Sequence, residues 1–254
     1  MTPAPELSTV PELTVVIPAY DEAARIGATL GNVLAYLEAR GSPFEVLVVD
    51  DGSRDGTAAT AAAFVGRGVR VLRLPQNRGK GAATRHGVAA SRGRRVLMSD
   101  ADLSTPIEEL AKLEGRLAAA EVVIGSRAAA GADVRRHQPL YRELMGKTFN
   151  LIIRLLGVRG VRDTQCGFKL MAGDVARELF AAMVTDGFAF DVELIWLARR
   201  RGYRVAEVGV VWVNSPASRV HPLADPPRMI LEILRFRRRH RRRDVRGSRA
   251  ATRT

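Results

Sequence analysis

Residues 95–106 read RVLMSDADLSTP, an apolar strand-like run that ends in two aspartates one residue apart. In an α/β sheet such a strand places both carboxylates at its carboxyl end, where these sheets bind ligands. Mg²⁺ or Mn²⁺ is usually held by one or two carboxylates together with substrate phosphates and water. Asp100 and Asp102 therefore indicate a divalent-metal site that a phosphate ligand completes, with a turn or a helix cap as the alternative use of Asp-x-Asp.

The sequence on either side alternates strand and helix patterns, as in a mostly parallel sheet wrapped by helices. Expected strands cover residues 13–18, 45–50, 69–74, 95–99 and 121–125, and a last one covers 204–213. Expected helices cover residues 23–40, 57–65 and 81–91, and another begins near Thr105 and Pro106. These patterns predict an α/β fold of the Rossmann-like, nucleotide-binding kind.

The composition is that of a globular protein, because 46% of the 254 residues are apolar and can bury a sizeable core. Cys166 is the lone cysteine, which excludes an internal disulfide and a thiolate zinc cluster. Residues 1–12 read as a flexible leader rather than a signal peptide. We therefore expect a cytoplasmic protein.

The net charge of +13 is concentrated near the carboxyl terminus, where residues 235–254 contain ten arginines and one aspartate. They carry +9, and the other 234 residues carry +4. This tract follows the apolar residues 229–234, a combination that favours an anionic lipid surface over a solvated tail or nucleic acid. No apolar run reaches the ~20 residues that cross a bilayer, so we expect peripheral attachment.

Residues 140–156 carry a second amphipathic pattern, with apolar side chains along one stripe of an expected helix. A helix of this kind either packs on the sheet or lies in the headgroup region of a membrane.

Residues 48–57 read VVDDGSRDGT, which places two carboxylates at the end of an expected strand. Carboxylates at such a position accept hydrogen bonds from a base or a ribose, and we expect Asp50 to face the ligand. Helix capping by Ser53 or Asp55 is the alternative use of this stretch, and the two uses are compatible.

Residues 77–81 read NRGKG at the start of an expected helix. Arg78, Lys80 and the backbone N–H groups there form either an anion site or a solvated turn. The sequence contains neither a G-x-G-x-x-G nor a P-loop motif, so a metal must take a larger part in binding phosphate.

Taken in order along the chain, LTVVIPAYDE, VVDDGS, NRGKG, LMSDADLSTP, GSR, RDTQCGFK and FDVE resemble the inverting glycosyltransferases of family 2. The resemblance runs from residue 13 to about residue 240. Within the family, the motif sequences are similar to those of the dolichyl-phosphate and polyprenyl-phosphate glucosyltransferases, with the dolichyl-phosphate mannosyltransferases as close relatives.

The resemblance implies a GT-A fold and a set of site residues. Residues expected to bind the nucleotide sugar are Pro18, Tyr20, Glu22, Val48, Asp50, Lys80, Asp100, Ala101, Arg127 and Arg219. Residues expected to bind the acceptor phosphate are Arg142, Lys169 and Arg219. The implied metal ligands are Asp102 and Asp100, the implied metal is Mg²⁺ or Mn²⁺, and the implied catalytic residues are Asp100, Asp102, Arg127 and Asp191.

Composition and the resemblance together predict three parts along the chain. Residues 1–12 are the leader, and residues 13–220 are the catalytic domain, with a donor-binding half at 13–127 and an acceptor-side half at 128–220. Residues 221–254 are a basic amphipathic segment with a disordered arginine-rich tail.

Two positions depart from the family pattern. Leu103, Ser104 and Thr105 follow Asp102, where mannosyl enzymes usually have a glutamine and glucosyl enzymes a Gly-Ala pair, so the sugar is left open. Arg219 stands where a lysine is commoner, which keeps the charge but changes the hydrogen-bond geometry.

A phosphate acceptor is largely ionised at pH 7, because its second pKa is near ~6, and it can attack without a general base. With a phosphate acceptor, neither Asp191 nor Glu193 is needed as a general base. These two acids either cap the helix that follows them or complete the site.

The resemblance implies metal-dependent transfer of a hexose, glucose from UDP-glucose first, to a polyprenyl phosphate at the cytosolic membrane face. Expected partners are the nucleotide sugar, the lipid phosphate and the membrane surface, without nucleic acid. The alternatives are transfer of mannose from GDP-mannose, transfer to a non-lipid alcohol with Asp191 as base, and a non-catalytic nucleotide- or RNA-binding protein that uses the arginine tail.

Overall fold

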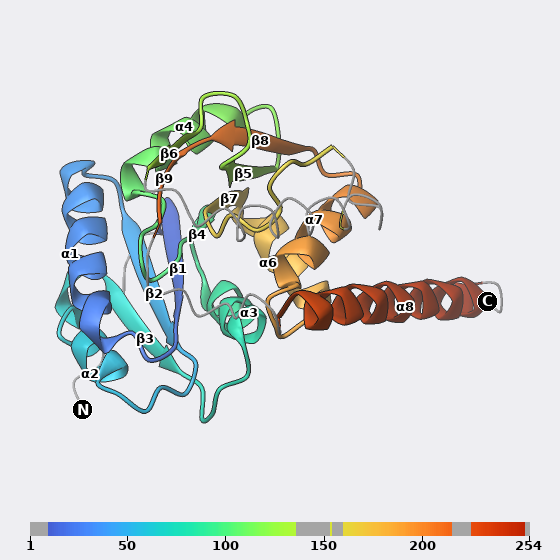
Figure 1. The fold of residues 1–254 in the computed structure, drawn as a ribbon, viewed down its shortest axis with the longest axis horizontal. Helices are drawn as coiled ribbons and strands as arrows, with labels where there is room; N and C mark the ends of the chain where they lie inside the picture. Colours follow the sequence, from blue (N-terminus) through green and yellow to red (C-terminus); the bar gives the residue numbers. More distant parts are fainter. Residues whose placement is uncertain (1–9, 136–152, 154–159, 215–224, 252–254) are drawn as a thin grey trace.

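The computed structural model describes residues 10–135, 153, 160–214 and 225–251, and its centre is a seven-stranded sheet (Figure 1). Its strands, in chain order, are β1 (Leu13–Ala19), β2 (Phe44–Asp50), β3 (Val69–Arg73), β4 (Arg95–Met98), β5 (Val122–Ser126), β7 (Lys169–Ala172) and β8 (Val205–Gly209). They lie in the order β3-β2-β1-β4-β7-β5-β8. Strand β7 runs antiparallel to both of its neighbours, and the other pairs are parallel.

Helices cover both faces of this sheet, which is why strands such as β1 and β2 bury apolar side chains on both faces. The helical elements are α1 (Ala23–Ala39), α2 (Thr57–Ala62), η1 (Val65–Arg67), α3 (Lys80–Ala90), η2 (Ile107–Glu109), α4 (Leu110–Leu117), α6 (Gly173–Ala182), α7 (Phe190–Arg200) and α8 (Asp225–Ala251). On strand β1 the buried Val15 and Ile17 pack with α1, whereas Val16 between them packs with α3 on the opposite face.

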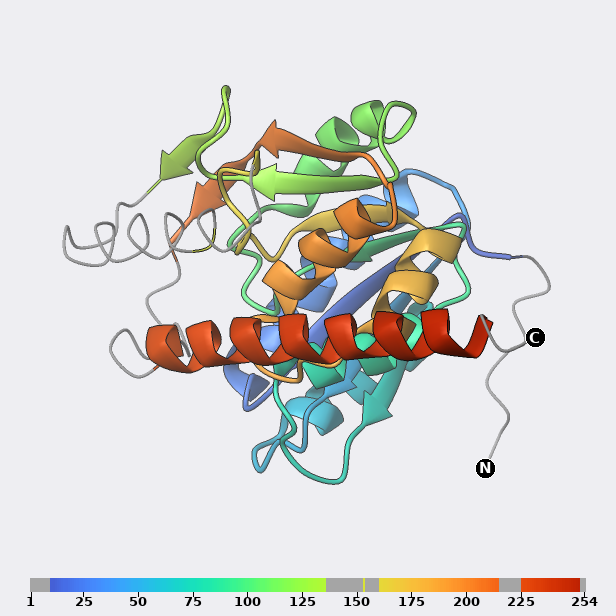
Figure 2. The same ribbon diagram turned by 90° about the vertical axis from the view of Figure 1, so that its right-hand side faces the viewer.

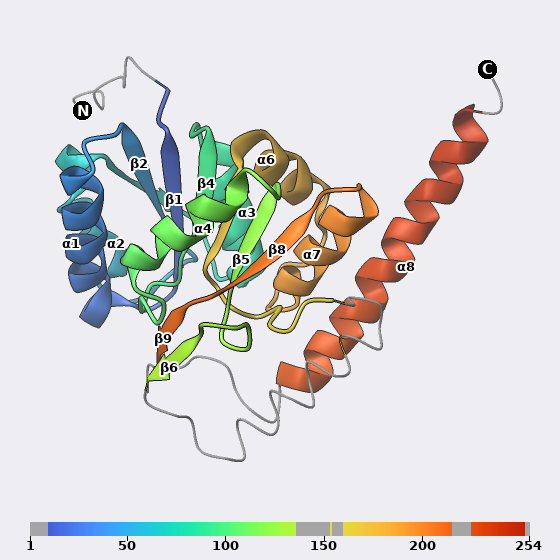
Figure 3. The same ribbon diagram turned by 90° about the horizontal axis from the view of Figure 1, so that it is seen from above.

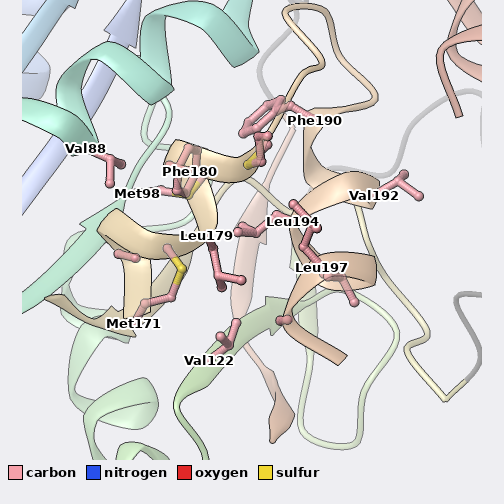
Figure 4. Close-up of a cluster of buried hydrophobic side chains, with 14 of the residues drawn as sticks. Val88, Met98, Val122, Met171, Leu179, Phe180, Phe190, Val192, Leu194 and Leu197 are labelled. Atoms are coloured by element: carbon pink, nitrogen blue, oxygen red, sulfur yellow. The ribbon is translucent and has the colours of Figure 1, made fainter. Parts of the chain in front are cut away.

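The larger hydrophobic core lies between the sheet and helices α3, α6 and α7. Figure 4 shows Phe180 of α6, Phe190 and Leu194 of α7 and Met98 of β4 in this cluster. The rings of Phe180 and Phe190 are 6.5 Å apart between centroids. This core fixes α7 against the sheet, and with α7 the two acidic residues of its first turn, Asp191 and Glu193.

Helix α8 packs along α7 and extends beyond the body of the protein (Figures 1 and 2). Met229, Ile233 and Phe236 are its buried apolar residues, with 6%, 1% and 1% of their surface exposed. Figure 3 shows α8 and α1 on opposite sides of the sheet. None of the helices in the described part of the chain is long and apolar enough to span a membrane.

Most of the expected strands are found within one or two residues of their predicted bounds. The expected strand at residues 204–213 is instead two strands, because the chain leaves the main sheet at Val210. Strand β9 (Val211–Val213) then pairs with β6 (Asp133–Arg135) in a separate two-stranded sheet. Strands β6 and β7 and helix α6 were not predicted.

The carboxyl-terminal segment differs from the disordered tail that we expected, because α8 continues as a helix to Ala251. Arginine has a high helix propensity, and the buried residues of the first four turns anchor the helix. The amphipathic segment predicted at residues 140–156 lies outside the described residues, apart from the buried Ile153.

Candidate functional site

A cavity of about 380 Å³ lies at the carboxyl ends of β1, β2 and β4, beside the start of α3. Its lining consists of Pro18, Ala19, Tyr20, Glu22, Arg25, Asp51, Asn77, Gly79, Lys80, Ala83, Asp100, Ala101, Asp102, Gly187 and Phe188. The position agrees with the rule that open parallel sheets bind ligands beyond the carboxyl ends of their strands. Pro18, Tyr20, Glu22, Lys80, Asp100, Ala101 and Asp102, all predicted from the sequence, are thus brought together.

Asp100 and Asp102 lie in the turn that follows β4. The Asp102 Oδ1 atom accepts a hydrogen bond of 3.0 Å from the backbone N–H of Ser104, and Leu103 between them takes a left-handed φ of 45°. The Asp100 carboxylate pairs with the Lys80 ammonium at 2.6 Å and keeps 34% of its side chain exposed. Burial alone would raise the pKa of Asp100, but Lys80, Lys169 and Arg127 outweigh it and the pKa is lowered, so Asp100 is ionised at neutral pH.

Gly167, in the loop before β7, supports the Asp100 carboxylate from the protein side. A Cβ atom added at Gly167 would lie 2.2 Å from the Asp100 Oδ2 atom. The carboxylate is therefore backed by main chain and aims into the cavity.

The two aspartates fit a metal ion that a substrate completes. In the described residues, no group of three or more His, Cys, Asp or Glu side chains forms a metal cage of protein atoms alone. Mg²⁺ and Mn²⁺ accept one or two carboxylates when phosphate oxygens and water supply the other ligands. Asp100 and Asp102 offer this donor set beside a cavity large enough for a small ligand.

Asp51 lines the cavity, whereas Asp50, the residue that we expected there, is turned away. The Asp51 carboxylate accepts the N–H groups of Arg78 and Gly79, both at 2.8 Å, and burial raises its pKa. Asp50 is fully buried, accepts the N–H of Ser53 at 2.9 Å and pairs with Arg73 at 3.1 Å. Successive residues of a strand end point to opposite faces, so only one of the two can face the ligand.

The start of α1 carries an ion pair at the cavity. Glu22 and Arg25 form a bidentate ion pair, and Glu22 contributes its carbonyl to the first turn of α1. The hydrogen bond from Arg25 to Glu22 raises the pKa of Arg25 against the opposing effect of burial, and the charges of Glu22, Asp102 and Asp100 add to this rise. Arg25 was not predicted from the sequence.

Arg127, predicted to hold a phosphate, instead forms an ion pair with Asp163. Its guanidinium forms two hydrogen bonds to Asp163, at 2.7 and 2.8 Å, and lies over the Trp212 ring. Burial would raise the pKa of Asp163, but Arg127 lowers it and is itself held charged. In the described part of the chain, Arg127 lies beyond the cavity lining.

Lys169, predicted to bind the acceptor phosphate, is fully buried beneath the site. Its ammonium pairs with Asp191 and donates to the Cys166 carbonyl at 2.5 Å. Burial raises the pKa of Asp191 despite the opposing effect of Lys169 and Lys80. The structure therefore gives Lys169 a partner within the protein, and it is not positioned to contact an acceptor.

Glu193, the second acid of α7, holds two helices together. It accepts the N–H groups of Val184 and Thr185 at 3.0 and 2.8 Å, and it contacts His240 of α8 at 2.6 Å. Glu193 thus joins the segment after α6 to α8, and it does not cap α7 as one of the two alternatives expected, because Ala189 stands at the N-cap of α7 without a side-chain cap hydrogen bond.

Several cavity residues were missed from the sequence, namely Arg25, Asp51, Asn77, Gly187 and Phe188. Asn77 could have been predicted, because it is the first residue of the NRGKG stretch. Gly187 and Phe188 come from the loop before α7, which carried no motif of its own. Val48 is fully buried in β2, and Arg142 and Arg219 lie outside the described residues.

Residues 14–180 match the family model described as glycosyl transferase family 2. The dolichyl-phosphate beta-glucosyltransferase of Drosophila melanogaster is 40% identical over 227 residues, which cover 83% of this chain and 70% of the relative. The human dolichyl-phosphate beta-glucosyltransferase is 35% identical over 245 residues, which cover 90% of this chain and 76% of the relative.

Two solved structures share the fold. Mannosyl-3-phosphoglycerate synthase from Rubrobacter xylanophilus has a TM-score of 0.67 and 23% identity, covering 93% of this chain and 75% of that one. Glucosyl-3-phosphoglycerate synthase from Mycobacterium tuberculosis, in complex with Mn²⁺, UDP-glucose and phosphoglyceric acid, has a TM-score of 0.67 and 21% identity, covering 89% and 79%. These similarities confirm the predicted GT-A fold.

Proposed function

The chain belongs to glycosyl transferase family 2 and is a glycosyltransferase, and from this we propose that it transfers glucose from UDP-glucose to a polyprenyl phosphate of the dolichyl kind. Asp100 and Asp102 beside Lys80, in one cavity at the sheet's carboxyl edge, carry the proposal. The names of the relatives support glucose as the sugar and a dolichyl phosphate as the acceptor.

The cavity provides the charges that a nucleoside diphosphate requires. Lys80 and Arg25 are the basic residues of its described lining, and Lys80 stands at the first position of α3, where backbone N–H groups favour an anion. Asp100 and Asp102 would hold Mg²⁺ or Mn²⁺, which supplies Lewis-acid stabilisation of the charge that develops on the leaving diphosphate. Asp51 and Tyr20 also line the cavity and would contact the nucleoside part.

The burial of Asp191 favours a phosphate acceptor over an alcohol. An alcohol requires a general base within hydrogen-bond reach, and Asp191, our candidate for that base, has only 4% of its side chain exposed and is paired with Lys169. A phosphate acceptor is already ionised and needs cations instead.

Helix α8 supports attachment to a membrane surface. Leu231 and Leu234 are 51% and 49% exposed on the side of the helix that faces away from α7. Exposed arginines lie on the same helix, one before these leucines at Arg228 and the others after them at Arg235, Arg238, Arg239, Arg241 and Arg242. Apolar side chains beside a basic tract suit an interface of anionic lipid, and we place the enzyme at the cytosolic face of the membrane.

The test is a transfer assay with purified full-length protein and Mn²⁺. UDP-glucose, UDP-galactose and GDP-mannose are each offered with a polyprenyl phosphate and, in parallel, with the free polyprenol, and the products are analysed by mass spectrometry. We expect glucosyl phosphoprenol from UDP-glucose alone, and the Asp102→Ala variant should retain its fold but form no product. Transfer to the free alcohol would overturn the acceptor assignment, and transfer from GDP-mannose would overturn the donor.

A further inference from the structure

The loop of residues 185–189, between α6 and α7, forms one wall of the cavity through Gly187 and Phe188. Its inner side is fixed to the start of α3. The Asp186 carbonyl accepts the N–H of Ala82 at 3.1 Å, and the Asp186 carboxylate pairs with Arg85 and, at 3.5 Å, with Arg78.

The outer side of the same loop is covered by one carboxylate of α8. The Glu232 Oε2 atom accepts the N–H of Ala189 at 3.2 Å. A Cβ atom added at Gly187 would lie 2.3 Å from the Glu232 Oε1 atom, so the carboxylate rests directly on the main chain of the loop. The loop is thereby clamped between α3 and α8.

Glu232 is presented by a rigid part of α8. Its neighbours Met229, Ile233 and Phe236 are buried against the body, and the Phe236 ring packs at a tilt of 58° against Trp196 of α7, with ring centroids 5.6 Å apart. A side chain on a packed helix holds a loop more closely than another loop residue does, because the helix loses little further freedom.

We propose that Glu232 is a positioning residue for the donor cavity: its carboxylate holds the 185–189 loop so that Gly187 and Phe188 form the cavity wall against a nucleotide sugar. The inference rests on the proposed function, since it takes the cavity to be the site of the nucleotide-sugar donor. Glu232 acts through the loop and does not itself line the cavity described here.

The test compares Glu232→Ala and Glu232→Gln with the wild-type full chain and with Glu178→Ala as a matched control. Glu178 also joins two elements, by contacts of 2.6 Å to Arg201 and to Tyr203, but lies away from this loop. Affinity for UDP-glucose with Mn²⁺ is measured by calorimetry without lipid, and KM and kcat are measured with the polyprenyl phosphate. Thermal unfolding of each variant reports whether the fold is intact.

We expect Glu232→Ala to weaken donor affinity and raise donor KM about tenfold, which corresponds to ~1.4 kcal/mol, with kcat nearly unchanged at saturating donor. Glu232→Gln keeps a carbonyl acceptor and should lose less, and Glu178→Ala should lose nothing. Gly187→Ala should displace the carboxylate and reproduce the loss, but should add nothing in the Glu232→Ala background, because both changes break one contact.

Unchanged donor affinity in a folded Glu232→Ala variant, or full additivity of the Gly187→Ala and Glu232→Ala losses, would overturn the inference while leaving the proposed function intact. Absence of UDP-glucose affinity in the wild-type protein with Mn²⁺ would instead defeat the proposed function and remove the premise of this inference.

Discussion

Substitutions in the Lys169–Asp191 pair distinguish most clearly between a structural and a catalytic role for Asp191. The two side chains are 0% and 4% exposed and contact each other beneath the cavity. The Lys169 ammonium has the Cys166 carbonyl as a second acceptor, at 2.5 Å. Asp191→Asn therefore removes the ion-pair partner that contacts a buried ammonium, and Lys169→Met removes the partner that contacts a buried carboxylate.

Breaking a buried ion pair from one side costs about 3–5 kcal/mol, because the remaining charge has no water to solvate it. We expect each single substitution to lower the free energy of unfolding by that amount. The double variant Lys169→Met/Asp191→Asn should be less destabilised than the sum of the two by about 0.5–3 kcal/mol, since neither charge then remains.

Urea unfolding of the four proteins at pH 7 measures these free energies, with an unchanged m-value as the sign that the unfolded state is the same. Turnover of the folded double variant is the decisive readout. Loss of a general base lowers kcat by about 10²- to 10⁴-fold, so a structural pair predicts a much smaller loss. A stable double variant that has lost 10²-fold or more in kcat would refute our account and make Asp191 the base.

Three further outcomes are expected. Gly167→Ala should displace the Asp100 carboxylate, because the added Cβ atom would lie 2.2 Å from its Oδ2 atom. Calorimetry should then find Mn²⁺-dependent binding of UDP-glucose weakened about tenfold. Unaltered binding would contradict the placement of Asp100. The hydrogen bonds from Arg204 lower the pKa of Glu121 to about 2, from an ordinary value of 4.5. The contribution of this contact to stability is complete above pH 4.5 and is lost as the pH falls toward 2. The difference in the free energy of unfolding between wild type and Glu121→Gln should therefore close over this pH range. Phe236→Ala should cost about 3–5 kcal/mol in urea unfolding, because this ring is 1% exposed between α8 and α7; a cost below 1 kcal/mol would mean that α8 is not docked in solution.

The sequence was sufficient to predict the parallel part of the sheet and the edge of the sheet at which the candidate cavity lies. Strands such as β1 and β2 are mostly apolar because helices cover both faces, and the acids at or after their ends mark the carboxyl edge. Strand β7 could not be predicted this way. Its four residues, KLMA, are too short to show a period, and its antiparallel place between β4 and β5 depends on residues far along the chain.

The directions of the side chains at the site could not be predicted from the sequence either. Asp50 and Asp51 are chemically equal and adjacent, and only the twist and end of β2 decide that Asp51 faces the cavity while Asp50 pairs with Arg73. Lys169 likewise reads as a cation free to bind phosphate, until its partner on α7, 22 residues later, is known. Charge in a sequence does not show which partner neutralises it.

The central claim is that Asp100 and Asp102 hold a divalent cation against the diphosphate of the donor. Calorimetric titration of UDP-glucose into the wild-type protein and into Asp102→Asn, each with Mn²⁺ and with a chelator, tests it most directly. We predict that wild-type affinity depends on Mn²⁺ and falls at least about tenfold in Asp102→Asn. Equal affinity in the presence of the chelator, or in the variant, would contradict the claim.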